Sequence, residues 1–248
     1  MKASLKHILP AILLILIFVQ VHTSCSDSGK LFPDATLELV VREAIQKPFG
    51  EIEKSDLEGL NNLSAYSRGI KNLSGLEYCI NLTDLHLGRN EISDVKPLAN
   101  LTGIERLYLE SNKISDITPL SNLTNLTQLH LGDNNLKKIS ALSDLTGLTR
   151  LWLGDNQIRD ITPLSNLINL NWLGLYNSGI NDVAPLANLP NLTVINLERN
   201  SISDIAPLIS NGGIGDGDTV DLRDNPLSEA SITLYIPQLE ARGVIVSW

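Results

Sequence analysis

Two of the four histidines, the two cysteines and one acidic loop are the groups of this chain that could do chemistry. His86 lies two residues after Asp84, and His130 lies in the same local sequence, "LHLG". Residues of these types support zinc binding or general acid–base catalysis. The segment "GGIGDGDTVD", residues 212–221, has the glycine and aspartate content of a phosphate or calcium loop.

The glycine-rich loop does not match a known cofactor motif. It lacks the glycine spacing of a dinucleotide loop and the D-x-[DN]-x-[DN]-G order of an EF-hand. We expect a short insertion before the last repeat, with Asp216 and Asp218 solvated. Calcium remains an alternative on carboxylate count alone, and no cofactor is expected.

A 22-residue repeat positions these residues. The segments "LTDLHLGRNEISDVKPLANLTG", "IERLYLESNKISDITPLSNLTN" and "LTQLHLGDNNLKKISALSDLTG" follow one another without a gap. Leucines three and then two apart predict a short strand with one face inward. Each unit begins at one of the positions Leu60, Leu82, Ile104, Leu126, Leu148, Leu170 and Leu192, and "TVDLRDNPL" adds a further unit.

An asparagine and a proline mark the two turns of each unit. The asparagine, as in Asn90 or Asn134, follows the strand, and its amide is expected to bond the backbone of the coils on both sides. Ser178 replaces it once, which weakens one position of that ladder. The proline, as in Pro97, fixes φ on the return side, and Ala141 replaces it in one unit.

This pattern resembles the leucine-rich repeat family, whose core is L-x-x-L-x-L-x-x-N-x-I. The continuation "SDITPLSNLTNL" resembles the 22-residue subclass of internalins and phosphatase regulators. The resemblance implies an α/β solenoid, a right-handed coil with short parallel strands on the concave face. It also implies 3₁₀ or irregular turns on the convex face and a helical N-terminal cap.

We expect four parts along the chain. They are a signal segment (1–24), a short tail with a helical N-terminal cap (25–58), about eight repeats (59–227) and a C-terminal cap (228–248). The two caps seal the ends of the stacked coils, which repeat arrays require.

Each cap has its own sequence pattern. Asp34 is expected to cap a helix. The apolar stripe of this helix is Leu37, Val40, Val41, Ala44 and Ile45. At the other end, Tyr235, Ile236, Leu239 and the strand-like "VIVSW" are expected to cover the last coil.

The register predicts which way Trp152 points. Leu151 and Leu153 are the inward strand leucines, so Trp152 between them points outward on the concave face. Three outward columns follow: Asp84, Arg106, Gln128, Arg150, Trp172, Val194; then His86, Tyr108, His130, Trp152, Gly174, Asn196, Asp221; then Gly88, Glu110, Gly132, Gly154, Tyr176, Glu198, Arg223.

The four aromatic residues between Leu82 and Leu208 all fall in these columns, which predicts a protein-binding patch. One alternative is that the rings only cover the sheet. The glycines at 132, 154 and 174 would let a partner, or the rings themselves, lie close to the sheet. The predicted binding residues are Arg106, Tyr108, Gln128, His130, Arg150, Trp152, Trp172 and Tyr176.

Neither histidine is predicted to bind metal or to catalyse a reaction. His86 and His130 are two coils apart, which separates them by about 9.6 Å at sheet spacing, too far for one zinc ion. Asp84 and His86 share a face and could pair, but no nucleophile accompanies them. The chain is therefore expected not to be an enzyme and to hold no metal.

The first residues predict export. Lys2 and Lys6 precede the apolar run from Ile8 to Val21, which is typical of a secretory signal. "VHTSCSDSG" resembles a lipoprotein lipobox, which implies that Cys25 is acylated and becomes the mature N-terminus. His22 departs from that motif, and cleavage nearby with Cys25 as a free thiol is the alternative. If Cys25 carries lipid, Cys79 has no cysteine partner and is expected to be a buried apolar residue.

The charge limits the class of partner. The chain has a net charge of −9, and without Lys2 and Lys6 this becomes −11. Nucleic acid and anionic membranes are therefore excluded as partners, and the membrane is contacted only through a lipid on Cys25. We expect a monomer.

The expected function is binding, by a bacterial protein that is lipid-anchored in the cell envelope or secreted. Its protein partner is unidentified. Internalin-like relatives bind host proteins, but no further domain and no sorting signal are expected after the repeats, so an envelope partner is as reasonable. Glycan or peptidoglycan binding by the same aromatic patch and a structural spacer are the alternatives. The signal segment disfavours an intracellular phosphatase regulator.

Overall fold

The computed structural model describes residues 30–248, and Phe32–Trp248 forms one compact unit. The predictions for the signal segment 1–24 and for Cys25 lie outside the described residues. Within the described part of the chain, no helix has the length and apolar character needed to cross a membrane.

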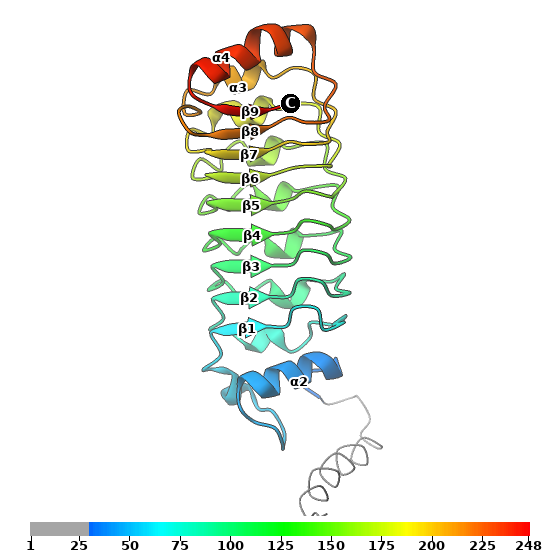
Figure 1. Cartoon of the computed structure of the whole chain (residues 1–248). Coiled ribbons are helices and arrows are strands. Elements are labelled where there is room, and N and C mark those ends of the chain that lie inside the picture. The colour runs from blue at the N-terminus through cyan, green and yellow to red at the C-terminus, as the bar shows by residue number, and fades with distance from the viewer. Residues whose placement is uncertain (1–29) are drawn as a thin grey trace, which may run out of the picture. The chain divides into compact units, whose positions relative to one another are not determined.

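Nine parallel strands form one sheet, in which each strand pairs with the next along the chain (Figure 1). The register is constant, so Leu107 pairs with Leu129 and Leu129 with Leu151. The predicted repeat is confirmed as one coil per unit. The strands are β1 (Asn62–Ser64), β2 (Asp84–His86), β3 (Arg106–Tyr108), β4 (Gln128–His130), β5 (Arg150–Trp152), β6 (Trp172–Gly174), β7 (Val194–Asn196), β8 (Thr219–Asp221) and β9 (Ile245–Ser247).

Short helices connect the strands on the opposite side of the coil. The turn at Ser140–Leu142 forms although Ala141 replaces the proline of its neighbours. The segment after β7 differs, because it is a short α-helix, α3 (Ala206–Ser210). The predicted 3₁₀ turns are confirmed at Leu76–Tyr78, Lys96–Leu98, Thr118–Leu120, Ser140–Leu142, Thr162–Leu164 and Ala184–Asn188.

The inward side chains of successive coils stack into one continuous core. Leu129, Leu151 and Leu173 are each 0% exposed. Burying such a side chain stabilises the fold by about 1.5–3 kcal/mol. Cys79 is also 0% exposed, as predicted. Burial, with a smaller contribution from the charge of Glu77, raises the pKa of its thiol to about 12.

An asparagine ladder joins the coils where the chain leaves each strand. The Nδ2 of Asn134 donates to the carbonyl oxygen of Leu109 in the preceding coil (3.0 Å) and to that of Leu131 in its own coil (3.1 Å). Its Oδ1 accepts from the amide of Ile114 in the preceding coil (2.9 Å). The same pattern recurs at Asn90, Asn112, Asn156, Asn200 and Asn225.

The expectation that each asparagine bonds both neighbouring coils is wrong. These amides reach only their own coil and the preceding one, because those bonds already use both N–H groups of each side chain. The link to the following coil is made by that coil's own asparagine. The ladder therefore runs in one direction along the stack.

Ser178 is the weak position of this ladder, as the sequence predicts. Its hydroxyl lies 3.1 Å from the carbonyl oxygen of Tyr176 and 3.4 Å from that of Leu153. In the preceding unit, the amide of Leu136 donates to Oδ1 of Asn156 (2.9 Å). The amide of Ile158 has the matching position, but Ser178 gives it no acceptor.

Helix α2 (Ala35–Ala44) covers the first coil. Oδ1 of Asp34 accepts from the amides of Thr36 (3.0 Å) and Leu37 (3.1 Å), which confirms the predicted cap. Its Oδ2 accepts from the amides of Lys71 and Asn72, which ties the cap to the repeats. Burial opposes ionisation of Asp34, but these four bonds outweigh it and lower the pKa of the carboxyl.

The apolar stripe of α2 is narrower than predicted. Leu37, Val40 and Val41 are buried. Ile45 is half-buried, and Ala44 is exposed. Ala44 is the last residue of the helix and is exposed there, so its inclusion in the stripe is wrong.

The C-terminal cap combines a helix with a ninth strand. A π-helical turn (Ser231–Tyr235) leads into α4 (Ile236–Ala241), in which Ile236 and Leu239 are buried. Tyr235 is half-buried. Strand β9 pairs with β8, so the predicted strand-like ending is confirmed.

Restoring the missing asparagine should stabilise the fold. Ser178→Asn is expected to raise the free energy of unfolding by about 1 kcal/mol, because it gives the Ile158 amide an acceptor. The matched control, Asn156→Ser, should lower it by about 1–3 kcal/mol by leaving buried backbone groups unpaired. Urea denaturation measures both. An unchanged or lower free energy of unfolding for Ser178→Asn would contradict the interpretation of Ser178 as the weak position of the ladder.

Candidate functional site

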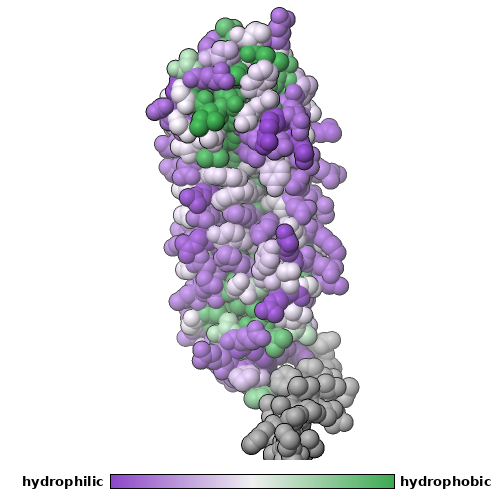
Figure 2. Space-filling model, in the orientation of Figure 1, coloured by the Kyte–Doolittle hydropathy of each residue, from purple (hydrophilic) through white to green (hydrophobic). Residues whose placement is uncertain are grey.

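The concave face of the sheet carries the candidate site. Trp152 is half-buried between Leu151 and Leu153, which are both 0% exposed, so its ring lies on the concave side as predicted. Figure 2 shows pale and purple surface along the middle strands, with green patches toward the two ends of the sheet. The middle of this face is therefore aromatic and polar rather than aliphatic.

Five rings stack into a continuous ladder along this face. The ring centroids are 4.0 Å apart for His86–Tyr108, 4.6 Å for Tyr108–His130, 3.5 Å for His130–Trp152 and 4.3 Å for Trp152–Trp172. The angles between neighbouring planes range from 24° to 50°. Each inner ring therefore has a neighbour on both faces and presents its edge to the solvent.

Glycines let the rings of Trp172 and Tyr176 lie close to the sheet. The ladder crosses from the second column to the first at Trp172, because Gly174 leaves its position empty. A methyl group on Gly174 would lie 2.7 Å from Cζ3 of Trp172. In the same way, the ring of Tyr176 occupies the space that a side chain on Gly154 would need. Of the two sequence-based readings of these glycines, close approach of the rings themselves is confirmed.

Polar groups flank the ladder on its first column. Arg106 forms an ion pair with Asp84, and the hydroxyl of Tyr108 donates to Oε1 of Gln128 (3.2 Å). No hydrogen bond joins Asp84 to His86, because Asp84 bonds Arg106 and Thr83 while the His86 ring stacks on Tyr108. The pairing considered for an acid–base site is therefore not formed.

All eight residues predicted for the site lie on this one face, but they do not form one cluster. Tyr108, His130, Trp152 and Trp172 are in the ladder, and Gln128 bonds Tyr108. The remaining three, Arg106, Arg150 and Tyr176, flank the ladder without joining the ring stack.

Two residues of this surface are missing from the predicted set. His86 begins the ladder, and its register position was sufficient to include it. Asp155 lies beside Tyr176, with φ of 55°, and its Oδ1 accepts from Nδ2 of Asn177 (2.7 Å). Burial raises the pKa of Tyr176, and the charge of Asp155 raises it further. Asp155 lies one residue past the third column, so a period-two reading of the strand stops short of it.

The part of the chain that the structure describes contains no cluster of side chains that could bind a metal ion. Among residues 30–248, no three histidine, cysteine, aspartate or glutamate side chains gather to hold an ion. In the glycine-rich loop, Oδ2 of Asp218 accepts from the amide of Gly215 (2.7 Å). Asp216 is exposed as predicted, but Asp218 is half-buried rather than solvated, because of this bond.

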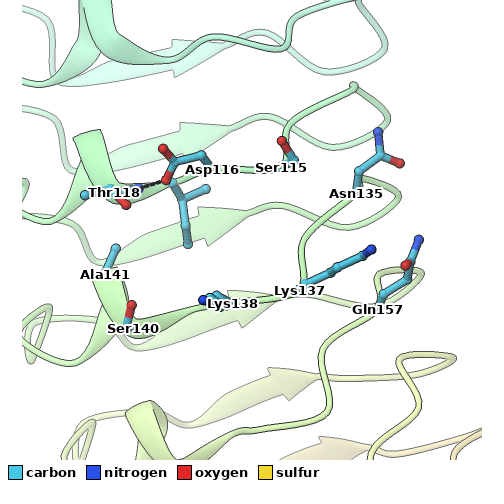
Figure 3. A pocket seen from close by; sticks show the side chains of 10 residues that line it. Ser115, Asp116, Thr118, Asn135, Lys137, Lys138, Ser140, Ala141 and Gln157 are labelled. Atoms are coloured by element: carbon cyan, nitrogen blue, oxygen red, sulfur yellow. Dashed lines mark hydrogen bonds between the residues drawn. The ribbon is translucent and has the colours of Figure 1, made fainter.

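A polar hollow lies on the side of the coils, where the repeat departs from its consensus (Figure 3). Oδ1 of Asp116 accepts from the amide of Thr118 there (2.8 Å). Lys138 replaces the aspartate in the next unit, and Ala141 replaces its proline. None of the ladder residues lines the hollow, so it is separate from the concave site.

Comparisons with known proteins agree with this geometry. A family profile described as leucine-rich repeats in two copies matches residues 80–122 and 124–166. An internalin of Listeria monocytogenes, InlF, is similar, with 36% identity and a TM-score of 0.77, over 84% of this chain and 62% of that chain. The match therefore spans less than two thirds of InlF.

Two further solved structures are similar. Internalin C2 of Listeria monocytogenes has 33% identity and a TM-score of 0.76, over 88% of this chain and 94% of that chain. A leucine-rich repeat protein of Leptospira interrogans has 22% identity and a TM-score of 0.72, over 79% of this chain and 51% of that chain. The Leptospira protein supports the fold alone.

The ladder should make stability depend on pH through His130. Burial, with a smaller effect from the charge of His86, lowers the pKa of His130 from 6.5 to about 4. The unfolded chain then binds the proton more readily, so this stabilisation is complete above pH 6.5 and is lost as the pH falls toward 4.

An NMR titration of the His130 ring measures this pKa directly. Urea denaturation of His130→Phe, which keeps a ring but cannot titrate, should show less loss of stability than the parent over the same pH range. A His130 pKa near the ordinary value would contradict its burial in the ladder.

Proposed function

The chain belongs to the internalin-like leucine-rich repeat family, and from this premise we propose that it is a non-catalytic module that binds a protein through its concave face. The observation that carries the proposal is the ladder of rings on that face. The proposed binding residues are the eight predicted from the sequence, Arg106, Tyr108, Gln128, His130, Arg150, Trp152, Trp172 and Tyr176, together with His86 and Asp155.

The ladder has the properties of a protein-binding surface. It joins half-buried aromatic edges to polar groups, and tryptophan, tyrosine and arginine are the residues that most often dominate the energy of interfaces. The rings hold each other in place, so little conformational entropy is lost when a partner binds. At strand spacing, the nine strands give a concave edge of roughly 38 Å, long enough for an interface of standard size.

Stacking disfavours the glycan alternative. Aromatic residues bind sugars through their flat faces, but Tyr108, His130 and Trp152 each have a ring neighbour on both sides, which restricts access to those faces. A protein can use ring edges, because they accept apolar contacts and leave the polar atoms of the rings accessible.

We further propose that the protein is exported and acts at the bacterial cell envelope or in the medium, as a monomer. The signal-like segment and the lipobox-like sequence before Cys25 support this, and a lipid on Cys25 would be the membrane anchor. The net charge of −9 disfavours nucleic acid as a partner.

A capture experiment tests the function. The chain without its first 25 residues keeps the compact unit Phe32–Trp248 whole. It is immobilised and exposed to envelope and medium extracts, beside a Trp152→Ala/Trp172→Ala variant. Trp248→Ala is the matched control, because it removes an exposed tryptophan outside the ladder. Circular dichroism first establishes that all are folded.

We expect a protein that the parent and Trp248→Ala retain and the double variant loses. Each hot-spot ring contributes about 2 kcal/mol or more, so the double variant, which loses two rings, should bind about a thousandfold more weakly. If all three chains retain the same proteins, or if none retains any protein, a structural spacer is the better interpretation. A parallel pull-down with polysaccharide tests the glycan alternative.

A further inference from the structure

The concave face carries opposite charges on its two sides around β5. We propose that it binds a protein segment with a carboxylate and a basic side chain on opposite sides of an apolar residue. This inference rests on the proposed function and names the chemistry of the partner. Arg150 forms the positive side, Asp133 and Asp155 form the negative side, and Trp152 and Trp172 form the middle.

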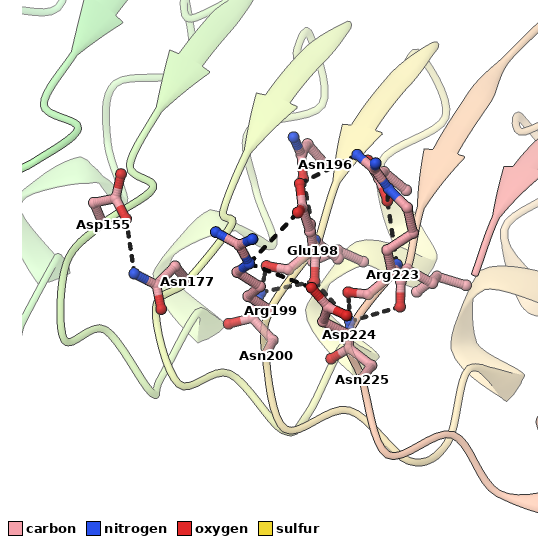
Figure 4. A network of polar contacts seen from close by, with 12 residues as sticks. Asp155, Asn177, Asn196, Glu198, Arg199, Asn200, Arg223, Asp224 and Asn225 are labelled. Carbon is pink, nitrogen blue, oxygen red and sulfur yellow. Dashed lines mark hydrogen bonds and ion pairs between the residues drawn. The ribbon is translucent and has the colours of Figure 1, made fainter.

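Arg150 differs from the other arginines of the three columns. Arg106 pairs with Asp84. Arg223 lies in the polar network of Figure 4, where carboxylates of the two last coils bind it within the protein. Arg150 is exposed, and its guanidinium makes no hydrogen bond or ion pair with any residue between 30 and 248.

The neighbours of Arg150 across the sheet explain why its guanidinium has no ion-pair partner among the described residues. In the first column, its partners across the sheet are Gln128 on β4 and Trp172 on β6, and neither carries a charge. A guanidinium can bind a carboxylate through two parallel hydrogen bonds. Arg150 can therefore hold an acidic group of a partner beside the ladder, at no cost to an internal ion pair.

The opposite side of the same coils is acidic. Asp133 is exposed and has no ion pair with any described residue. Asp155 bonds the amide of Asn177, which is uncharged. These carboxylates have no cation of their own, so a basic side chain of a partner would find an unneutralised site.

The two sides are separated by a length that one peptide segment can span. Arg150 is the first residue of β5, and Asp155 lies three residues past the end of that strand, where the chain turns with φ of 55°. The two sides are therefore closer together than the roughly 17 Å that five residues of extended strand would span. An extended partner segment covers this length in about four or five residues. Its central residue then lies over Trp152 and Trp172, where an apolar side chain is favoured.

Charge also excludes the simpler partners. The net charge of −9 repels a uniformly acidic segment. A uniformly basic segment would place a cation next to Arg150, which like charges disfavour. A segment with both charges satisfies both sides and can bind in one direction only.

A random peptide library displayed on phage tests the inference. The library is selected on the chain without its first 25 residues and, separately, on Arg150→Glu, Asp133→Lys and Trp172→Ala. The matched controls are Arg159→Glu and Asp144→Lys, which make the same charge changes at exposed positions outside the concave columns. Binding of the selected peptides, synthesised with a fluorescent label, is measured by anisotropy.

We expect selected peptides with an acidic and a basic residue about three to five positions apart around an apolar residue. Arg150→Glu should weaken their binding at least about tenfold and change the selected acidic position to a basic one. Asp133→Lys should likewise weaken their binding and change the selected basic position to an acidic one. Added salt should weaken binding. Arg159→Glu and Asp144→Lys should leave binding unchanged.

The outcomes separate this inference from the proposed function. Peptides that Trp172→Ala loses but that lack the paired charges would overturn the inference and leave the concave site standing. Peptides that bind Trp172→Ala with the same affinity as the parent would count against both the inference and the proposed function. If the parent enriches no peptide, the inference is overturned, because the surface then takes no short segment of this chemistry.

Discussion

The stacking of one coil on the next, fixed by the asparagine ladder, is the constraint on which the rest of the structure depends. A strand of three residues cannot bury an apolar face by itself, and the backbone at its end would be unpaired inside the coil. The amides of Asn134 and its equivalents pair that backbone with the preceding coil. Each coil therefore takes the register of its neighbour.

A fixed register aligns the outward side chains of successive strands in columns on the concave face. Since the inward positions are committed to the core, the outward positions are free to vary, and the same column recurs at each strand. His130 and Trp152 meet only because their strands are in register. The ladder of rings is thus a consequence of the stack, and the unpaired Arg150 beside it is a consequence of the residues one coil away.

Sequence reasoning predicted what depends on the period of the repeat or on a local side-chain bond. It gave the coils, the outward direction of Trp152 and the capping by Asp34, since each follows from spacing or from a local side-chain bond. It did not predict which way the asparagine amides reach or that Trp172 lies over Gly174. These depend on side-chain positions in three dimensions. The exposure of Ala44 depends in turn on where α2 ends on the first coil.

The central claim is that the ladder serves a partner and not the sheet, and equilibrium unfolding tests it most directly. Leu151→Ala, in the core, should lower the free energy of unfolding by about 2–5 kcal/mol. Trp152→Ala, one residue away, should lower it by less, about 1–3 kcal/mol, because it loses two ring contacts of about 0.5–1.5 kcal/mol each. If Trp152→Ala costs as much stability as Leu151→Ala, the rings are structural cover and the claim is contradicted.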